Sequence, residues 1–100
     1  MSLKDRRREA RLLRRIQDGD EKAAEQFVDQ HYESAYYWLL HLCGDCDQAA
    51  DLTQDTFLQV CEALGGFRGQ ASLRTWIHRI AYHVFLRAQR SPALNDLPLS

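Results

Sequence analysis

The first 91 residues of this chain contain no proline, and this absence constrains the fold more than any other feature, since the only prolines are Pro92 and Pro98. Proline breaks or kinks the interior of a helix, so a long stretch without it permits long helices. Apolar residues recur at helical spacing through most of this stretch, and no segment alternates as a strand does. We therefore predict an all-α fold, a compact bundle of three long helices preceded by a short N-terminal helix.

Capping and turn residues set the expected bounds of the helices. The segments with helical periodicity are 9–17, 21–43, 48–64 and 73–89. Residues that favour a helix N-terminus precede the last three segments: Asp20, then Asp45 or Asp47, then Ser72. Residues that end helices follow the second, third and fourth segments: Gly44, Gly65–Gly66 and Ser91–Pro92. The short connections favour antiparallel neighbours.

The same periodicity predicts which side chains are buried. The first segment supplies Leu12, Leu13 and Ile16. The second supplies Ala24, Phe27, Val28, His31, Ala35, Leu39 and Leu42. The third supplies Ala49, Leu52, Thr53, Thr56, Phe57, Val60 and Leu64, and the last supplies Leu73, Trp76, Ile77, Ile80 and Val84. A chain of 100 residues, 45% of them hydrophobic, has room for one such core and therefore for one small domain.

Charged residues are separated into blocks along the chain. Residues 1–15 carry seven basic and two acidic groups, residues 16–62 carry eleven acidic groups and one lysine, and residues 63–100 carry five arginines and one aspartate. The net charge of −1 conceals this separation. The blocks either keep a small protein soluble or, as we favour, mark different surfaces for different partners.

The basic segment 65–90 interleaves its arginines with aromatic residues and histidines. Arg79, His83, Arg87 and Arg90 form a stripe beside the buried face of the last helix. Arginine forks bind phosphate oxygens, and aromatic rings stack on unpaired bases. The segment therefore predicts a nucleic-acid surface that holds at least one base outside the duplex. Some of these side chains also have simpler explanations than nucleic-acid binding. Trp76 fits the core, and a histidine fits any polar surface.

Four motifs occur in order along the chain: LLRRIQDGDEKAAEQFVDQHY, DLTQDTFLQVCEAL, GGFRGQAS and LRTWIHRIAYHVFLRAQR. Together they resemble region 2 of bacterial RNA polymerase sigma factors, most closely the extracytoplasmic-function (ECF) subgroup, and the resemblance covers about residues 10–90. It implies a region 2-like helical domain over residues 1–90. Residues 91–100 would then be a tail or the start of an interdomain linker, and we expect the family's second DNA-binding domain, region 4, to be absent from these 100 residues.

The resemblance also implies two binding surfaces. The residues expected to contact the β′ clamp helices of core RNA polymerase are Asp51, Leu52, Gln54, Asp55 and Phe57. The loop from Phe67 to Ala71 resembles the family's specificity loop, which takes a flipped-out base of the −10 promoter element. The residues expected to bind the non-template strand of this DNA are Ala63, Phe67, Arg68, Arg74, His78, Arg79, His83, Arg87 and Arg90. Many family members carry Asn in place of His83 and an aromatic residue in place of His78.

In this interpretation the chain is not an enzyme but a specificity subunit for transcription initiation and its regulation. It would bind core RNA polymerase and recognise and melt the −10 element in the cytoplasm. An alternative is a protein-interaction module held by an anti-sigma factor, without independent DNA binding. The four histidines of the chain are divided between two of the predicted helices and indicate no catalytic set. No apolar run reaches the length of a membrane span, so we expect no membrane insertion.

The three cysteines, Cys43, Cys46 and Cys61, are too few and odd in number for a disulfide scaffold, which favours a reducing compartment. HLCGDCD places His41 beside two of them in a C-x-x-C spacing that can bind zinc. A fourth ligand is missing nearby, because only His31 or Cys61 are available at a distance. We therefore expect no metal and no cofactor, and a redox pair of Cys43 and Cys46 is a similarly unsupported alternative.

Overall fold

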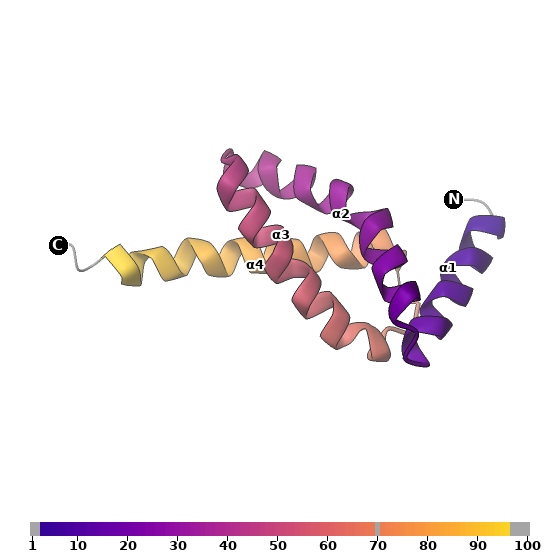
Figure 1. Cartoon of the computed structure of the whole chain (residues 1–100). Coiled ribbons are helices and arrows are strands. Elements are labelled where there is room, and N and C mark those ends of the chain that lie inside the picture. The colour runs from indigo at the N-terminus through magenta and orange to yellow at the C-terminus, as the bar shows by residue number, and fades with distance from the viewer. Residues whose placement is uncertain (1–2, 70, 97–100) are drawn as a thin grey trace.

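The computed structural model describes residues 3–69 and 71–96, with side chains described as far as Arg90, and its fold is all-α (Figure 1). The elements are α1 (Leu3–Gln17), α2 (Glu21–Cys43), α3 (Cys46–Ala63), the 3-10 turn η1 (Leu64–Gly66) and α4 (Leu73–Asp96). No strand occurs in the described residues, so the all-α prediction is confirmed. Helix α2 packs on α3, and α4 packs on both, while α1 lies at one end against α2 and η1 (Figure 1).

The predicted caps hold the helix ends. One side-chain oxygen of Asp20 accepts hydrogen bonds from the N–H groups of Lys22 and Ala23, at 3.0 and 3.1 Å. Of the two candidates for α3, Asp45 is the cap, since it accepts from the backbone N–H groups of residues 47 and 48. The Ser72 hydroxyl accepts from the N–H of Thr75 at 3.1 Å and caps α4. The short connections that these caps define hold consecutive helices close together.

Four predicted bounds are wrong. Helix α1 begins at Leu3 rather than near residue 9, because the intervening arginines and lysine are good helix formers. Helix α3 begins two residues early and ends at Ala63, where η1 tightens the last turn. Helix α4 continues past Pro92 to Asp96, since a proline removes one N–H donor without always ending a helix. The expected tail is therefore helical to Asp96, and residues 97–100 lie outside the described residues.

The core follows the predicted pattern with few exceptions. All seven side chains predicted for the third helical segment are buried, and so are Leu73, Ile77 and Val84 of α4. The remaining predicted residues, apart from the buried Leu12, Phe27, Ala35 and Leu39, are half-buried. The prediction missed Ala23 and Ala81, which have no exposed surface. Both are small residues, which let neighbouring helices approach closely.

The buried side chains form two clusters, and one of them supports the loop that precedes α4. That cluster joins Leu12 of α1 and Phe27 of α2 to Leu64 of η1 and Leu73 at the start of α4. The amide of Gln17 also donates a hydrogen bond to the carbonyl of Leu64, at 3.3 Å. Helix α1 and the loop are thus fixed to the same core. The second cluster joins the far end of α2 to the start of α3 and the middle of α4.

Candidate nucleic-acid interface

The residues of α4 predicted to bind DNA lie on two different flanks of the helix. Arg87 donates a hydrogen bond to the side chain of Gln59 on α3, at 2.9 Å, so its flank faces α3. The ring of His78 hydrogen-bonds with the hydroxyl of Ser34 on α2, at 3.0 Å, so its flank faces α2. At 100° per residue, the α3-side flank carries Arg79, His83, Arg87 and Arg90, and the α2-side flank carries Arg74 and His78. The structure therefore does not bring all the predicted residues together.

A cavity of about 370 Å³, here called the loop cavity, opens where the α3-side flank meets the loop. Its lining residues are Ala63, Gly66, Phe67, Ala71, Trp76 and Arg79. The rings of Phe67 and Trp76 form one wall, with centroids 4.8 Å apart and planes inclined by 46°. Three of the predicted residues, Ala63, Phe67 and Arg79, therefore converge on one hollow.

Trp76 is the lining residue that the sequence interpretation assigned to the core instead. It is half-buried, so one part packs on the core and another part lines the loop cavity. The sequence offered one indication of this second role, because Trp76 lies three residues before Arg79 on the same side of the helix. Arg68, by contrast, is exposed and does not line this cavity.

Local backbone geometry presents Phe67 to the cavity. The N–H of Phe67 donates to the carbonyl of Leu64, at 3.1 Å, and this bond closes η1. Gly69 then takes a φ of 79°, a left-handed conformation that favours glycine. The Ser72 cap begins α4 immediately afterwards. The chain therefore passes from η1 to α4 through a short connection in which Phe67 and Ala71 line the loop cavity.

The loop cavity can accept a flat ring next to an anion. Its aromatic wall suits the face of an unstacked base, which gains about 1–3 kcal/mol from stacking on an aromatic side chain. Arg79 supplies donors for a phosphate or for the edge of a base. His83, Arg87 and Arg90 continue along the same flank and are all exposed. The arrangement suits a nucleic-acid strand with one base removed from the stack.

The α2-side flank has a different character. The ring of His78 stacks on Trp38 with centroids 5.6 Å apart and planes 2° apart, and His41 stacks on the same indole at 6.2 Å. Burial lowers the pKa of His78 below its usual value, and the nearby Arg74 lowers it further. A neutral imidazole packed on α2 offers little attraction for phosphate. The DNA contacts predicted for Arg74 and His78 stay predictions.

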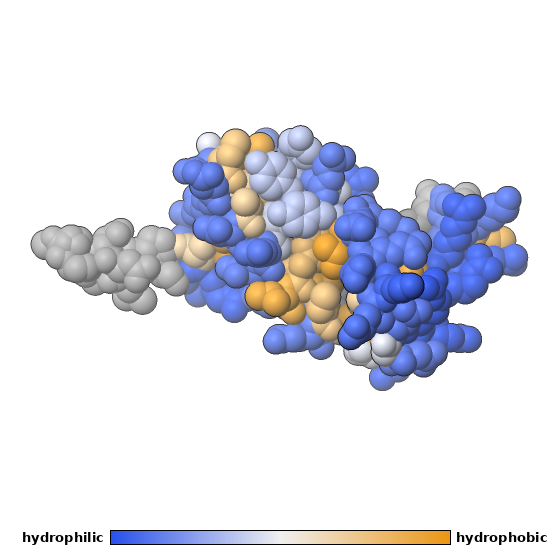
Figure 2. All heavy atoms as spheres, in the orientation of Figure 1, coloured by the Kyte–Doolittle hydropathy of each residue, from blue (hydrophilic) through white to orange (hydrophobic). Residues whose placement is uncertain are grey.

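The acidic face of α3 carries three of the five residues predicted to bind the polymerase. Asp51, Gln54 and Asp55 are exposed, whereas Leu52 and Phe57 are 5% and 6% exposed and belong to the core. The prediction missed Leu58, which shares the exposed face and is 66% exposed. An apolar strip lies over α3 between hydrophilic side chains (Figure 2). Leu58 could have been found from its spacing of four and three residues from Gln54 and Asp55.

The cysteine-containing turn shows no arrangement of metal ligands. The thiol of Cys43 donates to the carbonyl of Asp45 at 3.4 Å, and Cys46 is exposed. Among residues 3–69 and 71–96, no group of three or more His, Cys, Asp or Glu side chains is placed to hold a metal ion. Within the same residues, the apolar stretches of the helices are too short or too interrupted to cross a membrane.

The family model and the relatives that match this chain agree with one another. Residues 27–93 match the family model for sigma-70 region 2. The chain is 31% identical over 86 residues to the RNA polymerase sigma-H factor of Pseudomonas aeruginosa, covering 81% of this chain and 45% of that protein. It is 36% identical over 66 residues to the RNA polymerase sigma factor YlaC of Bacillus subtilis, covering 66% of this chain and 38% of that protein.

The ECF RNA polymerase sigma-E factor of Haemophilus influenzae is similar over a longer stretch, with 31% identity over 90 residues. That alignment covers 86% of this chain and 47% of the relative. The chain therefore spans less than half the length of each of these relatives.

Proposed function

This chain belongs to the sigma-70 region 2 family, within the ECF group of RNA polymerase sigma factors, and from that premise we propose that it binds core RNA polymerase and recognises and opens the −10 element of promoters. Sigma factors act in transcription initiation. In the proposal the polymerase carries out the chemistry in the cytoplasm, and this domain contributes recognition without catalysis.

The convergence of Phe67, Trp76 and Arg79 on the loop cavity is the observation that carries the proposal. The arginines of the α3-side flank bind phosphates and set the position of the strand without reading sequence. One base of the non-template strand leaves the stack and enters the loop cavity. Unstacking costs a few kcal/mol, and stacking on the aromatic wall offsets most of that cost.

The exposed face of α3 supports the proposed contact with the β′ clamp helices. Leu58 is a large apolar side chain on a helix surface, and Asp55 and Asp51 lie one and two turns before it on the same face. An apolar contact surrounded by charged groups is typical of an energetically dominant position in a protein interface. The acidic groups would select a basic partner surface and speed its association.

The same face supports a second candidate function, the binding of an anti-sigma factor. Leu58 is exposed in the chain alone, and a partner that covers it would block the polymerase. The two functions separate experimentally. An anti-sigma factor binds the chain without polymerase, whereas sequence-selective DNA binding depends on the polymerase.

The test of the proposed function is binding of the complex of this chain with core RNA polymerase to a fluorescent single-stranded −10 oligonucleotide. We expect Phe67→Ala to weaken binding about 5- to 150-fold, the range for the loss of one stacked base. We expect Arg79→Ala to reduce the slope of log affinity against log salt concentration by about one, which corresponds to the loss of one phosphate contact. Lys22→Ala, which removes an exposed cation near the start of α2, is the control. Equal affinity of the wild-type complex for promoter and scrambled strands would refute the proposal.

A further inference from the structure

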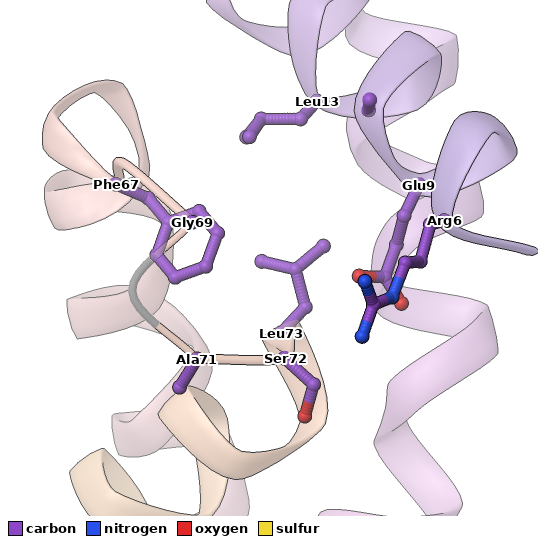
Figure 3. Close-up of a pocket in the computed structure, with 9 residues that line it drawn as sticks. Arg6, Glu9, Leu13, Phe67, Gly69, Ala71, Ser72 and Leu73 are labelled. Atoms are coloured by element: carbon purple, nitrogen blue, oxygen red, sulfur yellow. The ribbon is translucent and has the colours of Figure 1, made fainter. Parts of the chain in front are cut away.

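The corner between α2 and α3 holds two cysteines that the proposed function does not use. Cys43 is the last residue of α2, and Cys46 is the first residue of α3. Helix α3 separates this corner from the loop before α4, which follows the other end of the helix (Figure 1). At that other end, the hollow between α1 and the loop is lined by residues such as Leu13 and Phe67, and its lining includes no cysteine (Figure 3). The two thiols are therefore remote from the loop cavity.

The turn at the corner brings the sulfur of Cys43 close to the backbone of Cys46. The Cys43 thiol donates to the carbonyl oxygen of Asp45 at 3.4 Å, and this carbonyl belongs to the peptide group that joins Asp45 to Cys46. Standard bond lengths therefore place the sulfur within about 6.5 Å of the Cα of Cys46. Gly44 permits the tight reversal with a φ of 72°, a left-handed conformation that favours glycine.

Tyr36 places the second sulfur on the same side of α2. A hydrogen bond with the thiol of Cys46 is the main cause that raises the pKa of the Tyr36 hydroxyl. Tyr36 and Cys43 are two turns apart on α2, and both pack against the same core cluster. The side chain of Cys46 therefore turns back towards the face of α2 that carries Cys43. The C-x-x-C spacing alone left a redox pair unsupported, and these contacts supply the missing geometry.

The three thiols differ in access and in neighbours. Cys46 is exposed and Cys43 is half-buried, so an oxidant in solution meets Cys46 first. An exposed cysteine with a second cysteine beside it is the arrangement typical of thiols that sense oxidants. Cys61 is also exposed, but it lies fifteen residues after Cys46 on the same helix, about 22 Å away along the axis. Cys61 therefore cannot pair with either thiol of the corner.

From these features we propose that Cys43 and Cys46 form a reversible disulfide when the domain meets hydrogen peroxide. The thiolate of Cys46 attacks one oxygen of the peroxide, the O–O bond breaks, and Cys46 becomes a sulfenic acid. The hydroxide that leaves takes up the proton released by the Cys46 thiol. Cys43 then attacks the sulfur of the sulfenic acid, the S–S bond forms, and water leaves. In total the two thiols lose two electrons and two protons, and the peroxide is reduced to two molecules of water.

This modification site goes beyond the proposed function and does not depend on it. Disulfides in a reducing compartment are usually transient and report on oxidants, and a dithiol reductant reverses them by exchange. The bond would join the end of α2 to the start of α3 and would replace the hydrogen bonds that the two thiols make with Asp45 and Tyr36.

The test is the intact mass of the full chain after treatment with hydrogen peroxide, followed by alkylation of the remaining thiols. We expect the wild type to lose about 2 Da, the mass of two hydrogen atoms, and to keep one thiol that can be alkylated. Cys61→Ser is the matched control, which should lose the same mass at the same rate and keep no such thiol. Dithiothreitol should restore the three thiols of the wild type.

Substitutions at the corner separate the roles of the two cysteines. Both are made together with Cys61→Ser, so that no other thiol reacts. Cys43→Ser should stop at the sulfenic acid of Cys46, a gain of about 16 Da that dimedone traps. Cys46→Ser should react on the order of tenfold more slowly than Cys43→Ser, because its remaining thiol is half-buried.

Oxidation of the wild type in concentrated urea measures what the fold contributes. We expect disulfide formation to slow at least about tenfold there, because the unfolded chain no longer holds the two sulfurs in one corner. An equal rate in urea, a wild type that stops at the sulfenic acid, or peptide mapping that finds a bond to Cys61 would overturn the proposal. These outcomes are measured on the wild type, so they decide the proposal even where a variant fails to fold.

Discussion

The imidazole of His78 lies parallel to the indole of Trp38, with ring centroids 5.6 Å apart and planes inclined by 2°. This contact joins α4 to α2 on the flank opposite to the loop cavity. Helix α4 therefore has one flank that packs against an aromatic surface and one that presents exposed arginines beside a cavity. The division separates residues that stabilise the domain from residues that we propose bind the promoter.

Stability should fall as the pH decreases from 7.5 to 5.5. Burial is the main cause that lowers the pKa values of both His31 and His78, and Arg74 lowers them further. In the unfolded chain both groups return to a pKa of about 6.5. Below that value the unfolded chain binds more protons than the folded domain, so the free energy of unfolding decreases until the folded-state pKa values are passed. Thermal unfolding across this range measures the effect.

Replacement of both histidines provides the check on that pH dependence. His31→Gln combined with His78→Gln should give a shallower dependence of Tm on pH than either single substitution. The comparison uses slopes rather than absolute stabilities, because each substitution also changes packing. A double variant that retains the wild-type slope would show that other groups cause the dependence.

Two neighbouring residues of α3 should separate stability from polymerase binding. Phe57 is 6% exposed and stacks on Tyr32 at 5.9 Å, so Phe57→Ala should cost about 3–5 kcal/mol of stability. Leu58 is 66% exposed, so Leu58→Ala should change stability by less than about 0.5 kcal/mol. We expect Leu58→Ala to weaken binding to core RNA polymerase about tenfold, as for a moderate interface hot spot.

Tyr82→Ala is the control for that experiment, since Tyr82 is exposed on α4. It should bind the polymerase as the wild type does. Unchanged polymerase affinity in Leu58→Ala, with chemical denaturation confirming an intact fold, would place the contact elsewhere on the domain.

Gly44 and Gly65 should respond differently to alanine. Gly44 ends α2 with a φ of 72° and donates its N–H to the carbonyl of Leu40, whereas Gly65 has no positive φ. Neither position has atoms within 4 Å of an added Cβ, so backbone conformation alone distinguishes them. Gly44→Ala should destabilise the domain by about 1 kcal/mol or more, and Gly65→Ala should be neutral or slightly stabilising. Urea denaturation measures the free energy of unfolding of both variants. Equal decreases in the two variants would contradict this prediction.

The sequence predicted the elements well because local chemistry determines them. Caps such as Asp20 and Asp45 act within three residues, and the stripe on α3 follows from a single period. The continuation of α4 past Pro92 was not predictable from the same rules. A proline in a helix has an average free-energy cost, but it does not forbid the helix. Ala23 and Ala81 were missed because small side chains carry little periodic signal.

The candidate site was predictable only in part, because sequence spacing on α4 does not say which helix each flank meets. Arg79 and His78 are adjacent in sequence, yet one lines the loop cavity and the other packs on α2. Trp76 looked like core because it lies at a core position, and it also lines the cavity. The docking of α1 against η1 was also not predictable, because it joins residues as far apart in sequence as Gln17 and Leu64.

The most direct test of base capture by the loop cavity is a scan of the non-template −10 strand with 2-aminopurine, a fluorescent base, in complexes with core RNA polymerase. We predict that the fluorescence at the captured position changes on binding, because the base leaves its neighbours and stacks on Phe67 and Trp76. Phe67→Ala should abolish this change, while Tyr37→Ala, an exposed tyrosine of α2, should preserve it. The same fluorescence profile in Phe67→Ala as in the wild type would contradict base capture at this site.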